Sequence, residues 1–325
     1  MSLSRVAIAG ATGYSGQELV RLLEKHPHFQ IVARIGREDS PETLKGRVDI
    51  AFLCTPNEVS LEIAPRLLAQ GIHVVDLSGA FRLKKHSYQD WYGFHHSAAP
   101  ELARSEYALF PWKQIDSVKL GAAARLVANP GCYTTTVLMA LIPLLKSGLV
   151  EADPLFIDAK SGTTGAGRKA ETSLLFSEVY GEFKPYKVGR HQHWPELVEA
   201  VGEFARIDVN PVFVTELLPV SRGISAAIFS TWKSSAATDP LRLMKLESFL
   251  VEAYRGHSDI SVGSDPQLAS LKSVVGTNRV HIQVQEAFGK PLIFVVSDNL
   301  IRGAAGQALM NANLLAGYPV QEGLL

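Results

Sequence analysis

A cysteine follows a tight turn in the stretch NPGCY at residues 129–133. Pro130 and Gly131 are typical turn residues, and the apolar stretch 133–147 predicts one long helix directly after them. We therefore expect Cys132 at the first turn of a helix, where unpaired backbone amides and the helix dipole stabilise a thiolate. Because the thiolate is the nucleophilic form of cysteine, this position favours covalent catalysis by Cys132.

Two histidines form a second candidate for chemistry. His191 and His193 lie in RHQHWPE at 190–196, and on an extended segment both side chains would share one face. Histidine titrates near neutral pH and is therefore suited to proton transfer. We expect His191 to be the general acid and base, with His193 as the alternative.

The other cysteine, Cys54, ends the apolar run FLC within the strand expected at 48–56 and is predicted to be a core residue. Two cysteines without a CxxC spacing predict neither a disulfide framework nor a zinc site. The pair His191 and His193 has no evident third ligand near it in the sequence. We therefore expect no bound metal.

A glycine-rich stretch, GATGYSG at 10–16, lies between an expected strand at 5–10 and an expected helix at 15–26. Its GxxGxxG spacing is a variant of the dinucleotide fingerprint, in which glycines permit a tight turn and let backbone amides approach a pyrophosphate. Its place in the first strand–helix unit predicts a dinucleotide site. The expected contacts are Gly10, Thr12, Gly13, Tyr14, Ser15 and Gly16.

The residues after the second expected strand bear on the choice of dinucleotide. Arg34 and Arg37 come before Glu38 and Asp39. Arginine suits the 2′-phosphate of NADP, whereas an acidic residue suits the 2′-hydroxyl of NAD. We expect NADP (NADPH), with NAD as the alternative.

Two further segments are candidates for contact with the cofactor. The stretch SGTTGAG at 161–167 is rich in glycine and hydroxyl groups, and amides in such a loop meet phosphate or ribose groups. We expect Ser161, Gly162 and Gly165 to contribute there. Asn299, before the last expected helix, is a candidate for the nicotinamide amide.

The pattern of strands and helices predicts an α/β protein. Strand and helix alternate along the first part of the chain, which predicts a Rossmann-like, doubly wound parallel sheet. After residue 133 the strands have fewer helices between them, which predicts a mixed, largely antiparallel sheet in an α+β domain. The expected strands are 5–10, 29–33, 48–56, 72–78, 155–162, 212–220, 225–232, 281–288 and 292–299, and the main expected helices are 15–26, 58–70, 133–147, 241–254 and 302–316.

Composition excludes several classes of partner. The 325 residues include 32 Lys and Arg and 32 Asp and Glu, so the basic excess typical of nucleic-acid binding is missing. The start of the sequence has no apolar signal region, and apolar runs are too short for a bilayer span. We expect a cytoplasmic protein that binds neither nucleic acid nor membrane.

Several motifs together resemble one known family. The stretches GATGYSGQEL at 10–19, DLSGAFRL at 76–83 and NPGCY at 129–133 are similar to motifs of the N-acetyl-gamma-glutamyl-phosphate reductases, relatives of aspartate-semialdehyde dehydrogenase. So are SGTTGAGR at 161–168, RHQHWPE at 190–196, LPVSRG at 218–223 and DNLIRGAAGQA at 298–308. These matches occur in order over nearly the whole chain.

The resemblance implies an NADPH-dependent reductase that turns an acyl phosphate into an aldehyde through a thioester on Cys132. It implies a dinucleotide-binding domain at 1–132 plus 300–325, to which the last helix returns. A second domain at 133–299 would carry the catalytic and substrate groups and associate into a homodimer or homotetramer. Arginine suits the carboxylate and phosphate of such a substrate. The expected substrate contacts are Arg82, Asn129, Arg168, Arg190, Glu196 and Arg222.

The sequence departs from this family at a few places. The segment between the second and third strands is short, which predicts a trimmed adenine-side pocket, and residue 80 is Ala in place of Asp. His95 and His96 begin an insertion at 95–99 and are expected in a surface loop. Two alternatives stay open: a reductase of a related acyl phosphate (aminoadipyl phosphate on a carrier protein, or aspartyl phosphate), and a non-catalytic nucleotide sensor on the same fold.

Overall fold

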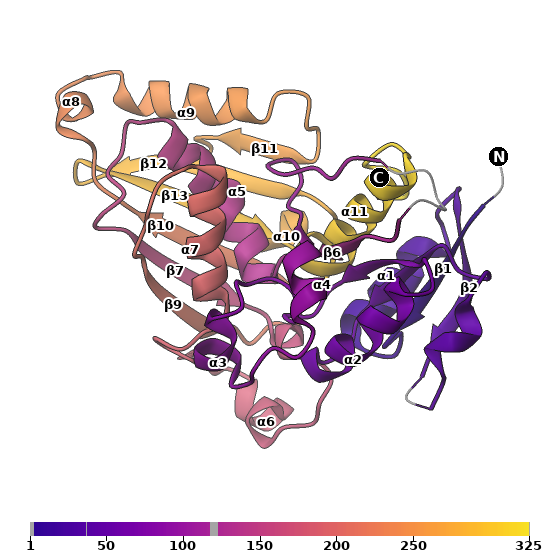
Figure 1. Cartoon of the computed structure of the whole chain (residues 1–325). Coiled ribbons are helices and arrows are strands. Elements are labelled where there is room, and N and C mark those ends of the chain that lie inside the picture. Colours follow the sequence, from indigo (N-terminus) through magenta and orange to yellow (C-terminus); the bar gives the residue numbers. More distant parts are fainter. Residues whose placement is uncertain (1–2, 37, 118–122, 325) are drawn as a thin grey trace. The chain divides into compact units, whose positions relative to one another are not determined.

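The computed structural model describes residues 3–36, 38–117 and 123–324. The chain divides into two compact units. Unit 1 comprises residues 1–131 and 304–325, and unit 2 comprises residues 132–303. Each unit contains one sheet with helices packed against it (Figure 1).

Unit 1 is built on a parallel sheet. Its described strands follow the order β2-β1-β3-β4-β6-β5, and every neighbouring pair is parallel. The order reverses between β1 and β3, which in doubly wound sheets is the position of the ligand crevice. The strands are β1 (Ser4–Ala9), β2 (Phe29–Ile35), β3 (Ile50–Leu53), β4 (His73–Asp76), β5 (Glu106–Tyr107) and β6 (Leu126–Ala128).

Helices connect these strands. The described part of the crossover from β2 to β3 contains the 3-10 helix η1 (Pro41–Leu44) and no longer helix, whereas β3 and β4 are joined by a full helix, α2 (Asn57–Leu68). The last helix, α11 (Gly306–Ala316), packs against β4 and α1 (Tyr14–Leu23), so the expected return of the C-terminal helix to the Rossmann-like unit is confirmed. The other helices in the described part of this unit are α3 (Ser87–Tyr92) and α4 (Ala99–Arg104).

Unit 2 is built on a mixed sheet, as the sequence predicts. The described strands follow the order β11-β12-β13-β10-β7-β9-β8. The pairs β7–β9 and β11–β12 are parallel and the other four are antiparallel. The strands are β7 (Phe156–Ser161), β8 (Lys184–Pro185), β9 (Val212–Leu217), β10 (Ile224–Phe229), β11 (Ile260–Gly263), β12 (Val280–Ala287) and β13 (Lys290–Ser297).

One apolar helix forms the centre of this unit. Helix α5 (Cys132–Lys146) is buried from Tyr133 to Leu145, because nearly all of its side chains are apolar or threonine. It packs on β10, β12 and β13 and contacts α7 (His193–Phe204) and α9 (Arg242–Ala253). The shorter helices are η2 (Thr163–Ala166), η3 (Thr172–Leu174), α6 (Phe176–Val179), α8 (Ser234–Ala237), α10 (Leu271–Val274) and the π-helical turn η4 (Ile301–Ala305).

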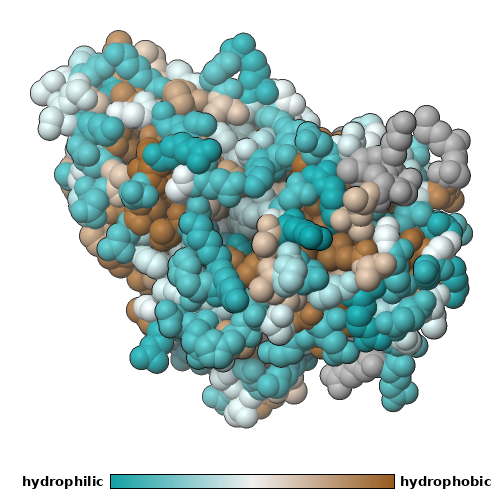
Figure 2. All heavy atoms as spheres, viewed as in Figure 1, coloured by the Kyte–Doolittle hydropathy of each residue, from teal (hydrophilic) through white to brown (hydrophobic). Residues whose placement is uncertain are grey.

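The described residues contain no helix that combines the length and apolar character needed to cross a membrane. Hydrophilic residues cover most of the face seen in Figure 2, and hydrophobic residues appear there as separate areas. Within the same described ranges, no three His, Cys, Asp or Glu side chains form a group that could hold a metal ion.

Candidate active site

The glycine-rich turn of unit 1 lies at the carboxyl ends of β1 and β3. Gly10 adopts a left-handed backbone (φ 77°), and a Cβ there would overlap the carbonyl of Cys54 at the end of β3. A Cβ at Gly16 would overlap the carbonyl of Gly10. Both glycines are therefore required by the turn itself.

Gly13 is different, because its backbone is extended (φ −72°) and a Cβ there would meet only the Gly10 carbonyl, at an ordinary 3.5 Å. The internal packing would accept a side chain at this position. Gly13 precedes α1, so its missing side chain leaves the first-turn amides of that helix approachable by an anion. Thr12 is exposed, and Tyr14 and Ser15 are half-buried beside the same turn.

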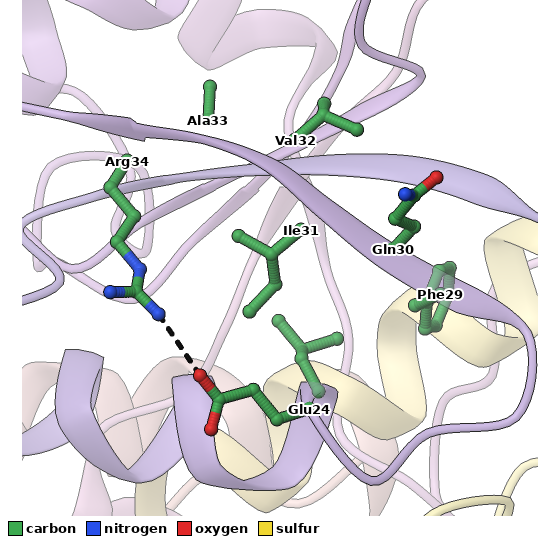
Figure 3. Close-up of a pocket in the computed structure, with 8 residues that line it drawn as sticks. Glu24, Phe29, Gln30, Ile31, Val32, Ala33 and Arg34 are labelled. Carbon is green, nitrogen blue, oxygen red and sulfur yellow. Dashed lines mark hydrogen bonds and ion pairs between the residues drawn. The ribbon is translucent and has the colours of Figure 1, made fainter.

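The end of β2 carries one of the two arginines expected at the cofactor. Arg34 is exposed and forms an ion pair of 3.0 Å with Glu24, across a pocket lined by residues 23, 24 and 29–34 (Figure 3). In the loop that follows, the backbone amide of Gly36 donates to Oδ2 of Asp39 at 2.7 Å. Arg37 lies outside the described residues.

Two residues expected to bind substrate form hydrogen bonds in the chain segment before Cys132. Arg82 donates through Nε to the carbonyl of Asn129 (2.7 Å) and through Nη2 to that of Leu77 (2.6 Å). Asn129 is fully buried, and its Oδ1 accepts from Nδ2 of Asn311 at 3.1 Å. These contacts hold the NPG turn within unit 1.

Cys132 is the first residue of α5 and is half-buried. Its carbonyl accepts from Oγ1 of Thr136 at 2.9 Å, and that hydroxyl also contacts Oγ of Ser297 at 2.7 Å. The predicted position at a helix start is confirmed. The other cysteine, Cys54, directly follows β3 and is half-buried as a residue, so the expected core position is only partly met. Its backbone carbonyl faces Gly10, and burial of its thiol, together with the charge of Asp76, raises its pKa to about 12.

A residue that sequence reasoning missed lies against Cys132. Gly303, in η4, comes so close that a Cβ there would be 2.7 Å from Cβ and 3.1 Å from Cα of Cys132. π-helical turns are rare and are often found at functional sites. Gly303 therefore packs directly against Cys132. Its signal in the sequence is the GAAG stretch within DNLIRGAAGQA.

His191 is buried, and its Nδ1 accepts a hydrogen bond from the backbone amide of His193 at 3.2 Å. Burial, together with the positive charge of Lys187, lowers its pKa to about 3. The extended segment assumed for the two histidines is wrong, because His193 begins helix α7. The imidazoles nevertheless lie together, with ring centroids 4.8 Å apart.

Tyrosines connect His191 with the start of α5. The ring of Tyr133, directly after Cys132, meets the His191 ring edge to face, at 5.3 Å between centroids and 89° between planes. The ring centroids of Tyr186 and His191 are 5.7 Å apart. The Tyr186 hydroxyl donates a hydrogen bond to the Tyr133 hydroxyl at 2.9 Å. Burial raises the pKa of both phenols, and the charge of Cys132 contributes to each shift. Sequence reasoning assigned no role to either tyrosine.

The 161–167 loop is tied to the loop after β9. Gly162 donates to the carbonyl of Gly223 (2.9 Å), and a Cβ at Gly162 would be 2.7 Å from the backbone nitrogen of Arg222. Asn299 bridges both loops: its Oδ1 accepts from Gly223 at 2.8 Å and its Nδ2 donates to Oγ1 of Thr164 at 3.0 Å. The structure thus brings together five of the expected site residues, namely Ser161, Gly162, Gly165, Arg222 and Asn299. Gly165 is exposed, and a Cβ there would be 3.0 Å from Oγ of Ser161 and 3.9 Å from Nδ2 of Asn299.

The remaining expected residues differ in exposure. Glu196 is buried in the first turn of α7, whereas Arg168 and Arg190 are exposed. The expectation that both His95 and His96 lie on the surface is half wrong. His96 is buried against Phe81 and Tyr88, because these rings form an aromatic pocket and the Ala80 carbonyl lies 2.8 Å from its Nε2.

Comparison with known proteins places the chain in a family. Residues 132–299 match the model of the semialdehyde dehydrogenase dimerisation domain, and residues 5–45 and 35–114 match that of the semialdehyde dehydrogenase NAD binding domain. N-acetyl-gamma-glutamyl-phosphate reductases from Bacillus anthracis and Bacillus cereus strain 03BB102 are each 38% identical over 348 aligned positions, covering 98% of both chains. The chain belongs to the N-acetyl-gamma-glutamyl-phosphate reductase family.

Solved structures share the fold at lower identity. Aspartate semialdehyde dehydrogenase II from Vibrio cholerae, in complex with ASA, has a TM-score of 0.67 at 18% identity and covers 97% of this chain and 98% of its own. Aspartate semialdehyde dehydrogenase with NADP from Candida albicans has a TM-score of 0.62 at 16% identity, covering 96% and 98%. As a member of the N-acetyl-gamma-glutamyl-phosphate reductase family, the chain is an oxidoreductase with an NAD binding domain.

Proposed function

We propose that the chain reduces N-acetyl-gamma-glutamyl phosphate to N-acetylglutamate 5-semialdehyde with NADPH, in arginine biosynthesis. The observation that carries the proposal is the contact between Tyr133, directly after Cys132, and His191. It links a thiol at a helix N-terminus to a buried imidazole within one unit. The names of the relatives at 38% identity supply the substrate. Unit 1 would then bind the dinucleotide and unit 2 the acyl phosphate.

The reaction needs a nucleophile and a group that stabilises negative charge. The Cys132 thiolate attacks the acyl carbon, the carbonyl oxygen takes up the negative charge, and the C–O bond to phosphate breaks to leave a thioester. NADPH, when bound at the Gly10–Gly16 turn, supplies the hydride that reduces the thioester. The resulting thiohemiacetal oxyanion reforms the C=O bond and expels the thiolate. The proton consumed overall goes to the departing phosphate.

His191 fits the stabilising role in its neutral form. Because Nδ1 accepts the His193 amide, the neutral imidazole carries its proton on Nε2. A pKa of about 3 keeps the ring neutral at physiological pH. We propose that this Nε2–H donates a hydrogen bond to the oxyanion at both tetrahedral stages, as neutral histidine does in other enzymes. His193 and Glu196 are the nearby groups that we propose for proton transfer to phosphate and for orientation.

The anionic groups of the substrate call for arginine. We propose Arg222 as the main ligand of the substrate anion, because it lies between the 161–167 loop and the Asn299 segment. Arg168 and Arg190 are exposed and would act at the rim. Ser161, Gly162, Gly165 and Asn299 would meet the nicotinamide ribose and amide. Arg82 and Asn129 would act indirectly, by holding the NPG turn.

A preference for NADP over NAD is supported by Arg34. Its guanidinium is exposed at the end of β2 and held by Glu24 (Figure 3). In this position it would bind a 2′-phosphate, and Glu24 would compete for it. Arg34→Leu should therefore raise KM for NADP more than for NAD, and Glu24→Gln should lower KM for NADP. Equal changes for the two cofactors in both variants would contradict this assignment.

Association into a homodimer or homotetramer is supported by the open face of the sheet in unit 2. Phe156, Val212 and Phe229 are register partners on three adjacent strands and are 46%, 52% and 37% exposed. A contiguous apolar row of this kind is expected at an interface. The match of residues 132–299 to a dimerisation domain points to a second copy of the chain as its occupant. Since a catalytic thiol has to stay reduced, we propose that the enzyme works in the cytoplasm.

The test is the reverse reaction with two aldehydes side by side. The purified chain is mixed with NADP and phosphate and then with N-acetylglutamate semialdehyde or aspartate semialdehyde, and absorbance at the NADPH band is followed. We expect phosphate-dependent NADPH formation with the first aldehyde and far slower formation with the second. Equal or faster reaction of aspartate semialdehyde would assign the chain to another acyl phosphate. No reaction with either would favour a nucleotide sensor.

A further inference from the structure

Asp298 directly follows β13 and is 0% exposed. Its Oδ1 accepts hydrogen bonds from the backbone amides of Leu300 (2.8 Å) and Ile301 (2.9 Å) and from Nη2 of Arg222 (2.9 Å). Its Oδ2 accepts from the backbone amide of Gly276 at 2.8 Å. A buried carboxylate is tolerated when it is paired and hydrogen-bonded, and Asp298 meets both conditions. Its four donors come from three different segments of unit 2.

The same residue anchors the turn behind the nucleophile. The main-chain carbonyl of Asp298 accepts the amide of Gly303 at 2.9 Å. Gly303 in turn lies so close to Cys132 that no Cβ would fit between them. A shift of Asp298 would therefore move the wall against which Cys132 rests.

Both the side chain of Arg222 and the backbone next to it are held by hydrogen bonds. Its side chain is 23% exposed, so it reaches from the buried carboxylate toward the surface of unit 2. The next residue, Gly223, donates its amide to Asn299, the neighbour of Asp298. The guanidinium and the backbone behind it are thus fixed by two consecutive residues, Asp298 and Asn299.

We propose that Asp298 is a positioning residue that orients Arg222 toward an anion at Cys132. One carboxylate fixes the guanidinium, and the main chain of the same residue fixes the turn behind the sulfur. The distance between the bound anion and the nucleophile is thereby set by a single buried residue. This inference rests on the proposed role of Arg222 in binding the substrate anion.

The test compares an anionic with a neutral alkylating agent. Cys132 of the full chain is alkylated with iodoacetate and with iodoacetamide, and the Cys132 peptide is quantified by mass spectrometry. The Cys54 peptide serves as the internal reference. A cation held near the sulfur accelerates alkylation by the anion iodoacetate more than alkylation by the neutral iodoacetamide. Arg222→Gln should therefore lower the ratio of the iodoacetate to the iodoacetamide rate constant at Cys132 by at least about threefold. Asp298→Asn keeps the shape of the side chain but replaces one acceptor by a donor, and should lower the ratio similarly.

The double variant decides whether Asp298 acts through Arg222. If it does, Asp298→Asn combined with Arg222→Gln lowers the ratio no further than Arg222→Gln alone, because coupled residues are not additive. If the two reductions multiply, or if Asp298→Asn leaves the ratio unchanged, the proposal is overturned. An unchanged ratio in Arg222→Gln overturns it as well. Glu286→Gln, which breaks a separate ion pair with Arg242 in unit 2, is the control and should leave the ratio and the turnover unchanged.

Steady-state kinetics add a readout that a merely structural role would not move. Asp298→Asn should raise KM for phosphate in the reverse assay on the order of tenfold, the effect of losing one hydrogen bond to a charged group. If this variant is not soluble, Asp298→Glu keeps the charge but displaces it by one methylene, and the same fall in the alkylation ratio is expected.

The proposed function and the proposed role of Asp298 are tested by different measurements. Lack of turnover by the unaltered chain contradicts the proposed function, whereas the alkylation ratios judge Asp298 without any turnover.

Discussion

The backbone amide of His193 donates a hydrogen bond to Nδ1 of His191, over 3.2 Å. This contact leaves Nε2 of His191 as the proton-bearing nitrogen of the neutral ring. If His191 acts as a neutral hydrogen-bond donor, another side chain with an N–H group can replace it in part. If His191 acts as a general acid and base, only a side chain that titrates can replace it.

The first prediction uses this difference. The amide nitrogen of Gln reaches roughly the position of Nε2, whereas that of Asn reaches only the position of Nδ1. His191→Asn should lower kcat by about 10²–10³-fold, the cost of losing one oxyanion donor, and His191→Gln should recover part of the loss. NADPH affinity should change little in either variant. Equal losses in both would instead favour proton transfer by His191, and a large loss confined to His193→Asn would move the role to His193.

The second prediction concerns pH and stability. The pKa of His191 is lowered from 6.5 to about 3 by burial and by Lys187. Between these pH values the unfolded chain binds a proton at His191 that the folded chain does not bind. The free energy of unfolding should therefore fall as the pH drops from about 6.5 toward 3, by up to roughly 1.4 kcal/mol per pH unit from this residue. Above pH 6.5 its contribution is fully present and constant.

Urea unfolding of the unaltered chain and of His191→Asn at several pH values measures this effect. Other buried histidines, including His26 and His96, also have lowered pKa values, so the informative quantity is the difference in slope between the two proteins. His191→Asn should show the shallower dependence below pH 6.5. Parallel curves would show that His191 titrates normally in the folded chain.

The third prediction concerns Gly303. A Cβ there would be 2.7 Å from Cβ of Cys132, so Gly303→Ala should displace Cys132, the proposed nucleophile. Small displacements of reacting groups cost on the order of 10²-fold in rate, and we expect a loss of this order in kcat/KM. Gly202→Ala in α7 is the matched control, because a Cβ there meets nothing within 4 Å. It should keep full activity and stabilise the fold by about 0.4–1 kcal/mol. Full activity in Gly303→Ala would remove Gly303 from the site.

Much of the fold could be predicted because it depends on local patterns. Apolar β-branched strands alternate with helices in unit 1, and the uniformly apolar stretch after Gly131 forms α5 almost where it was expected. The position of Cys132 was predictable for the same reason, since proline and glycine fix the turn before the helix. The second strand extends to Ile35, beyond the expected end, because strand boundaries depend on pairing with β1.

Parts of the site could not be predicted because they depend on contacts between distant residues. Pro195 and Glu196 are signals of a helix start, and weighing them would have placed His193 on a helix. By contrast, nothing in the sequence shows that the fork of Arg82 spans two backbone carbonyls, or that Tyr186 reaches Tyr133 from 53 positions away. Residue types indicate which chemistry is available. Only the fold shows which polar groups already form hydrogen bonds within the protein.

The fourth prediction concerns Cys132 itself. Cys132→Ser should lower kcat by at least ~10³-fold, because a covalent nucleophile is removed. The variant should still bind NADPH, as measured by fluorescence titration. In the unaltered chain iodoacetamide should label Cys132 much faster than Cys54, whose thiol is held protonated by a pKa of about 12. Substrate should suppress only the labelling of Cys132. Near-normal turnover of Cys132→Ser would refute the thioester mechanism.

The last prediction concerns the open face of the sheet in unit 2. Phe156 and Phe229 are register partners and are both partly exposed, so burying them against a second copy would stabilise an oligomer. Phe229→Glu places a charge in this row and should shift the chain toward smaller species in sedimentation velocity runs. The control is Phe288→Asn in the turn between β12 and β13, where the side chain is fully exposed and the backbone is left-handed (φ 52°). Asn accepts that conformation, so the control should sediment like the unaltered chain. If Phe229→Glu sediments like the unaltered chain as well, the interface lies on another surface.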